Sequence, residues 1–83
     1  AFYIRLMVLD QPGVLADVAR AFATEQVSLE SLIQRGRSEV EAVPVVLTTH
    51  ATSEAALRRA LDTIAALPAV IEPPRMIRIE NSL

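Results

Sequence analysis

The chain has 83 residues, of which 52% are apolar, and this length is enough for one domain and not for two. The formal net charge of −2 and the sequence pI of about 5.2 disfavour nucleic acid as a partner. Cysteine is absent, which excludes a disulfide framework, a thiolate zinc site and a cysteine nucleophile. The lack of cysteine also fits a cytoplasmic protein, which is our expectation. No apolar run approaches the roughly 18 residues of a membrane-spanning helix, so we expect no membrane partner.

The first residues are Ala-Phe-Tyr, without an initiator methionine, and the alternation of a strand begins at once. We therefore expect residues 1–83 to form a single domain within a longer polypeptide. A domain of this size buries only about 60–65% of the surface that its unfolded chain exposes. Association with another copy or another domain would stabilise it.

The spacing of apolar residues predicts a strand followed by a helix at the start of the chain. Residues 2–9 alternate in the manner of a strand, with the even positions toward the core and Arg5 on the other face. After the turn residues "DQPG", the spacing becomes helical from Pro12 to about Glu25, with an apolar side made of Leu15, Val18 and Phe22. Asp10 is expected to cap this helix at its N-terminus.

The segment 27–36, "VSLESLIQRG", predicts a second strand, with Leu29 and Ile33 on one face and Leu32 on the other. A polar hairpin around Gly36 follows, and Glu39 and Glu41 are expected to face solvent there. The third strand is predicted over residues 42–50. It is more buried, and Pro44 belongs near its start because proline cannot donate to a ladder.

The remaining segments predict a helix and a strand. Thr52-Ser53-Glu54 supplies a cap oxygen and an acid for a helix that Pro68 ends. The last strand is predicted over residues 69–80, interrupted by two prolines, with Ile77 and Ile79 inward and Arg78 and Glu80 outward.

The resulting order is β-α-β-β-α-β. Its standard packing is the α+β ferredoxin-like plait, a four-stranded antiparallel sheet with both helices on one face. The strands are then expected in the spatial order 4-1-3-2, which places the strand 27–36 at an edge.

Residues that carry chemistry are scarce. His50 is the only histidine and has no partner at ligand spacing, so we expect no metal site and interpret it as a polar residue at a strand end. Gly13 alone is not a dinucleotide fingerprint, because the G-x-G-x-x-G pattern is missing. We therefore expect no catalytic residues and no bound cofactor in these 83 residues.

The turn "LDQPGVLA" is the best candidate for a binding site. The first N–H groups of a helix lack intrahelical partners and attract anions, so the groups near Gly13, Val14 and Leu15 could hold a carboxylate. Asp10 could accept from an ammonium group, which makes a free amino acid a better ligand than a phosphate. The alternative is that Asp10 is only a cap and that Pro12-Gly13 is only a turn.

Ser28, at the start of the second predicted strand, lies a whole helix away from Asp10, about 20 Å within one chain. An edge strand invites pairing with a second copy. If two copies pair the strands 27–36 antiparallel about a two-fold axis, Ser28 of one approaches Asp10 of the other. This arrangement predicts a homodimer with two equivalent sites at its interface.

The element order, together with "LDQPGVLADVA" and "VSLESLIQ", resembles the ACT domain over essentially the whole chain. The likeness is greatest to the ACT domains at the C-terminal end of bacterial homoserine dehydrogenases, as "VPVVLTTH" and "MIRIE" indicate. The resemblance implies an effector site at the first turn and the start of the second strand. By motif position its residues are Asp10, Gln11, Gly13, Val14, Leu15, Ser28 and Leu29.

The resemblance further implies feedback control by an amino acid, commonly threonine, of an NAD(P)-dependent dehydrogenase whose catalytic domain lies N-terminal to this chain. A degenerate ACT domain that only dimerises is the alternative, and an RNA-binding plait is a third class. One departure matters, because related domains usually carry glycine where this chain has Gln26. Gln26 must adopt the left-handed conformation or the helix must end differently.

Overall fold

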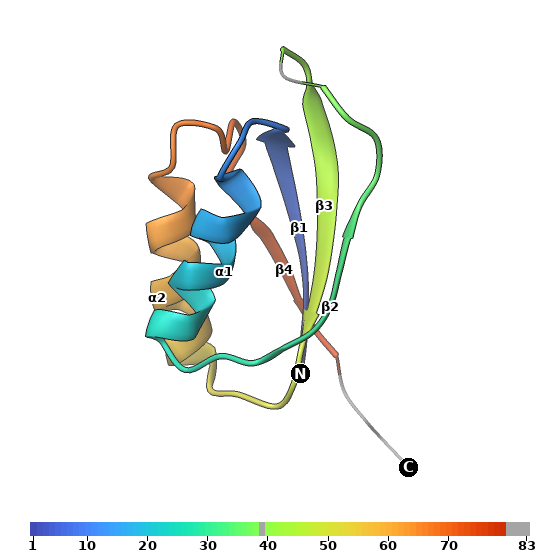
Figure 1. Ribbon diagram of the computed structural model, residues 1–83. Helices are drawn as coiled ribbons and strands as arrows, with labels where there is room; N and C mark the ends of the chain where they lie inside the picture. The colour runs from blue at the N-terminus through green and yellow to red at the C-terminus, as the bar shows by residue number, and fades with distance from the viewer. Residues whose placement is uncertain (39, 80–83) are drawn as a thin grey trace.

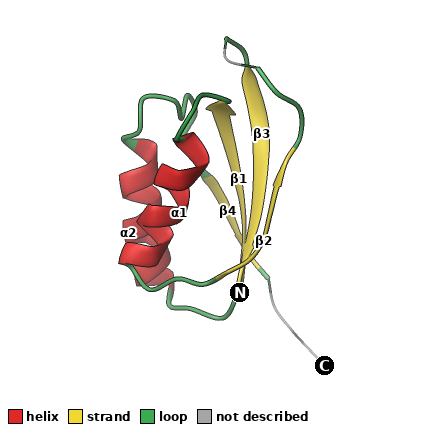
Figure 2. Cartoon of the chain, in the orientation of Figure 1, coloured by secondary structure: helices red, strands yellow, loops and turns green. Residues whose placement is uncertain are grey.

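The architecture is a four-stranded sheet with two helices packed on one face. The computed structural model describes residues 1–38 and 40–79. The elements are β1 (Phe2–Leu9), α1 (Val14–Thr24), β2 (Leu29–Gln34), β3 (Ala42–Thr49), α2 (Glu54–Ala65) and β4 (Arg75–Arg78). Paired strands are antiparallel, in the order β2-β3-β1-β4, and both helices cover the same face (Figures 1 and 2). The ferredoxin-like plait and its strand order are confirmed.

The core lies between the helices and the sheet. The even positions of β1 are buried, as their alternation predicts. The odd positions of β3 are buried as well, and both sets meet Val18, Phe22 and Leu57 from the helices. Thr49 is the one buried polar residue among those described, and its hydroxyl accepts the backbone N–H of Phe2 at 3.1 Å. This bond satisfies a donor at the start of β1 that would otherwise be buried without a partner.

The start of α1 differs from the sequence prediction. The N-cap is Gly13, in the left-handed region at φ 85°, and no side chain caps the helix. The N–H of Val14 donates to the carbonyl oxygen of Gln11 at 3.2 Å, and the first helical bond runs from Asp17 to Gly13. The prediction that Asp10 caps the helix is therefore wrong, and the helix begins at Val14, not at Pro12.

The end of α1 resolves the question raised by Gln26. This residue adopts the left-handed conformation at φ 58°, the only non-glycine residue to do so in the described part of the chain. Beyond it, the N–H of Val27 donates to the carbonyl oxygen of Phe22 at 2.9 Å, as in a Schellman motif. The helix thus ends as it would with glycine at this position, but Gln26 has a Cβ atom and its backbone is strained there.

Replacing Gln26 by glycine should raise the free energy of unfolding by about 1 kcal/mol, because the left-handed conformation penalises a residue with a Cβ atom. For a domain of this size that gain corresponds to a rise of roughly 4–8 °C in Tm, measurable by thermal denaturation. Gly13→Ala is the matched control with the opposite sign, since Gly13 also has a positive φ. A loss of stability in Gln26→Gly would contradict this account.

The start of α2 follows the sequence prediction. Ser53 is the N-cap, and its hydroxyl accepts the N–H of Ala56 at 3.1 Å. Glu54 in the first turn accepts from Arg58 at 3.1 Å and from Arg78 at 2.9 Å. The N-terminus of α2 is therefore tied to β4.

The strand β2 is shorter than predicted and is bulged. It spans Leu29–Gln34, so Ser28 precedes it, and the register with β3 shifts between Leu29 and Ser31. The extra residue at the bulge places Leu29 and Leu32 opposite the buried Thr49 and Leu47 on the core side. The predicted assignment of these two leucines to opposite faces is therefore wrong.

The strand β4 also differs from its prediction. Only Arg75–Arg78 form it, after an isolated bridge between Val70 and Val8. Its register puts Ile77 opposite Tyr3 on the face without helices, while Arg78 lies opposite the buried Phe2 with its guanidinium 5.8 Å from the ring centroid. Ile77 and Arg78 are thus reversed relative to the prediction, and Ile79 is also exposed. Glu39 and Glu80 lie outside the described residues.

Candidate functional site at the β1–α1 turn

A cavity of about 300 Å³ opens beside the turn between β1 and α1. Residues 10–13, Leu15, Ala16 and Arg37 line it. The turn is short because Gly13 reverses the chain with a positive φ. A Cβ atom added at Gly13 would meet no heavy atom within 4 Å, so glycine is required here for its backbone conformation and not for close approach.

Asp10 supplies the negative charge of this cavity. Its Oδ2 accepts from Nε of Arg37 at 2.9 Å, and its side chain is only 16% exposed. The hydrogen bond from Arg37, followed by one from Gln34, holds the pKa of Asp10 below its usual range. The backbone N–H of Asp10 also donates to the carbonyl oxygen of Ser38 at 2.7 Å. The turn is therefore fastened to the β2–β3 hairpin through both side chain and backbone.

The positive side of the cavity is made of Arg37 and the start of α1. The N–H of Val14 is engaged within the turn, contrary to the prediction that it is available to a ligand. The N–H groups of Leu15 and Ala16 belong to the first turn of the helix, where no intrahelical acceptor exists. One carboxylate and one guanidinium thus stand side by side, a combination that complements a zwitterion.

The structure groups the predicted site residues in two places. Asp10, Gln11, Gly13 and Leu15 line the cavity together. Val14 is buried and packs in the core instead. Ser28 and Leu29 lie at the far end of β3, where the N–H of His50 donates to the carbonyl oxygen of Ser28, whereas Leu9 pairs with Ala42 at the near end. Eight strand residues separate the two ends, about 25 Å, so one chain does not unite the two groups.

Three lining residues were not predicted from the sequence, namely Pro12, Ala16 and Arg37, and Arg37 is the one that carries a charge. It lies 27 positions from Asp10, in a hairpin whose polar residues all looked like solvent-facing turn residues. No local pattern marks such a contact. The only available signal is that a partly buried carboxylate in an arginine-rich chain needs a cationic partner.

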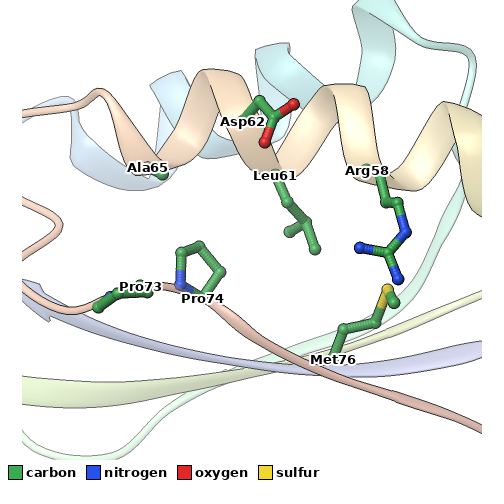
Figure 3. A pocket seen from close by; sticks show the side chains of 7 residues that line it. All are labelled: Arg58, Leu61, Asp62, Ala65, Pro73, Pro74 and Met76. Atoms are coloured by element: carbon green, nitrogen blue, oxygen red, sulfur yellow. The ribbon is translucent and has the colours of Figure 1, made fainter.

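A larger cavity of about 550 Å³ lies elsewhere, between α2 and β4 (Figure 3). Leu61, Met76 and two prolines form much of its wall, and Asp62 also lines it. The Arg58 guanidinium at its rim already pairs with Glu54. This cavity contains none of the residues of the turn.

His50 directly follows β3 and is exposed, 3.8 Å from Glu30, as expected of a polar residue at a strand end. Within residues 1–38 and 40–79, no group of three metal-ligating side chains converges. None of the helices described has the length and apolar character needed to span a bilayer.

Comparison with protein families decides the classification. The family model described as "ACT domain" matches residues 2–69. The chain belongs to the ACT domain family. The ACT domain of a GTP pyrophosphokinase from Chlorobium tepidum shares its fold, with a TM-score of 0.71 at 10% identity over 92% of this chain and 95% of that one.

Longer relatives contain this ACT domain as a minor part. A homoserine dehydrogenase of Neisseria gonorrhoeae is 38% identical over 98% of this chain and 19% of its own length. That of Helicobacter pylori is 32% identical over the same shares. The crystal structure of a homoserine dehydrogenase from Thiobacillus denitrificans superposes with a TM-score of 0.84 at 37% identity, over 95% of this chain and 17% of that one. The chain spans about a fifth of the curated relatives that it matches.

Acid should destabilise this ACT domain partly through Asp10 and Glu54, because Arg37 lowers the pKa of Asp10 and Arg58 lowers that of Glu54. A carboxyl whose folded-state pKa is lowered contributes stability above its unfolded pKa, and this contribution is lost as the pH falls through the folded value. The free energy of unfolding should therefore decline from about pH 4 downward. In urea titrations at several pH values, Asp10→Asn and Glu54→Gln should each flatten that decline.

Proposed function

We propose that the chain is the C-terminal regulatory ACT domain of a homoserine dehydrogenase and that residues 1–83 bind a free amino acid, with threonine as the first candidate. The observation that carries the proposal is similarity along 98% of the chain to one and the same part of homoserine dehydrogenases. In this proposal the domain works in the cytoplasm and controls the reduction of aspartate semialdehyde to homoserine.

The cavity at the β1–α1 turn supports an amino acid as the ligand. Asp10 suits an ammonium group and Arg37 suits a carboxylate, and the two groups stand 2.9 Å apart at their nearest atoms. A phosphate would meet the charge of Asp10 at close range. Since Arg37 is 87% exposed and Asp10 is not, the arginine is the partner that moves when a ligand enters.

The second half of the proposed site comes from a second copy. The N–H of Arg35 donates to Pro44, so alternate residues of β2 bond β3, and the backbone groups of Leu32 and Gln34 face the free edge. Antiparallel pairing of two such edges about a two-fold axis would bring Ser28 and Leu29 of one copy to the turn of the other. The two domains would then form one eight-stranded sheet with two sites.

In this proposal, regulation arises because the amino acid binds one arrangement of the two domains more tightly than another. An amino acid that binds between two domains favours one arrangement of the pair, and coupling of this kind is typically worth about 1–3 kcal/mol. The dinucleotide NAD(P) would be held by the rest of the enzyme, because these 83 residues contain no Gly-rich phosphate-binding turn. The catalytic residues would also lie in the rest of the enzyme, because these 83 residues contain no cysteine and one isolated histidine.

A calorimetric titration of the chain with each of the common amino acids tests the proposal. We expect heat and a concentration-dependent rise in Tm with threonine or a close analogue, and none with homologues that lack the α-ammonium group. A domain that only dimerises is the second candidate, favoured by the fact that Arg37 already pairs with Asp10. No heat and no thermal shift with any amino acid would support that second function.

A further inference from the structure

The face of the sheet without helices carries an unusual combination of residues. We call this face, which lies opposite the two helices in Figure 2, the open face. On β1 it carries Tyr3, Arg5 and Met7. Five large hydrophobic residues are exposed in the described chain, and all but Val40 lie in register with this face. Ile77 opposite Tyr3 is 62% exposed, and Ile33 opposite Val46 is 49% exposed.

The arginines of the open face differ from the others in their ion pairing. All eight basic residues of the chain are arginine, and five of them pair with a carboxylate: Arg20, Arg37, Arg58, Arg59 and Arg78. The other three, Arg5, Arg35 and Arg75, have no ion pair among residues 1–38 and 40–79. Arg5 and Arg75 are direct cross-strand partners, and the bond from Arg35 to Pro44 continues the same face.

These neighbouring arginines and exposed isoleucines should destabilise the domain and favour its association when water surrounds the open face. Like charges directly opposite each other on a sheet destabilise it, and exposed isoleucines in a contiguous patch favour association. A partner surface that is apolar and carries carboxylates would neutralise the arginines and bury the isoleucines. On the helix side, by contrast, each arginine forms an ion pair with a carboxylate.

We propose that the open face docks onto an apolar, carboxylate-bearing surface of the same enzyme polypeptide outside these 83 residues. This rests on the proposed function, in which the chain is one fifth of a longer enzyme. Two copies of the open face do not fit each other, because three cations would face three cations. RNA fits poorly as well, since Tyr3 is the only aromatic side chain on the face and the chain is acidic overall.

Docking here leaves the proposed dimer edge and the effector cavity free. The edge of β2 pairs in the plane of the sheet, and the cavity lies at the end of β1 beside α1. The open face therefore provides a second, independent contact through which a change at the dimer interface reaches the remainder of the enzyme.

Arginine modification in the full-length polypeptide tests the docking. With phenylglyoxal and peptide mass spectrometry, Arg5 and Arg75 should react at least about tenfold more slowly than Arg20, which is 73% exposed on α1 and serves as the internal control. In the 83-residue chain alone, all three should react at similar rates. The double variant Arg5→Glu/Arg75→Glu should make Arg35 reactive in the full-length polypeptide.

Equal reactivity of Arg5, Arg75 and Arg20 in the full-length polypeptide would overturn the proposal. Protection in the 83-residue chain that grows with its concentration would point to a second copy instead, and protection only after addition of RNA would point to nucleic acid. The experiment is done without amino acids. A failure of amino-acid binding in calorimetry therefore leaves its outcome unchanged, and the two proposals are tested separately.

Discussion

Replacing Asp10 by alanine should lower the affinity for the bound amino acid by about 10–100-fold, because a hydrogen bond to a charged group contributes about 1.5–3 kcal/mol. The domain should stay folded, since Gly13 and not Asp10 is the N-cap of α1. Calorimetric titration gives the affinity, and circular dichroism reports the fold. The variant should therefore remain folded while it loses affinity for the amino acid.

Asp17→Ala is the matched control for this experiment. Asp17 is also an aspartate at the start of α1 and also pairs with an arginine, Arg20 at 3.1 Å, but it does not line the cavity of Asp10. Its replacement should change the affinity less than about twofold. Equal losses in the two variants would mean that Asp10 acts through the general charge of the helix terminus and contacts no ligand.

Dilution should abolish tight binding of the amino acid, because half of the proposed site belongs to the second copy. Below the dissociation constant of the dimer, the apparent affinity should fall by at least about tenfold. By linkage, a saturating amino acid must tighten the dimer in the same proportion. Analytical ultracentrifugation with and without threonine measures the second effect, and equilibrium dialysis with radiolabelled threonine at several protein concentrations measures the first.

The turn and Ser28 cannot meet within one chain, so a monomer with full affinity would contradict the shared site. A control keeps the experiment specific: an amino acid that produces no heat should leave the dimer equilibrium unchanged. If such a compound lowers the dissociation constant of the dimer, the effect is a general one of the added solute and does not arise from binding at the site.

The order of strands and helices could be predicted because each segment has its own period. The alternation of β1 also determines its buried face without reference to neighbours. The cap at Ser53 is likewise local, since a hydroxyl meets an N–H three residues ahead. Such features depend on a few adjacent residues, so a single sequence contains them.

The errors arose where a distant partner decides the outcome. The bulge in β2 and the register of β4 depend on pairing with β3 and β1, and a shift of one residue exchanges the two faces of a strand. Asp10 had two possible partners, the helix N-terminus and Arg37, and only the folded hairpin shows that Arg37 accounts for its position. Half of the candidate site was therefore visible in the turn itself, whereas its cation was not.

The two edges of the sheet bear on how far assembly can proceed. The strand β4 is four residues long and directly follows Pro73 and Pro74. Proline and short strands discourage the addition of further strands. Two copies joined through β2 would present only the two β4 edges to the outside. The sheet can then close as a finite pair and resist growth into an open-ended fibre.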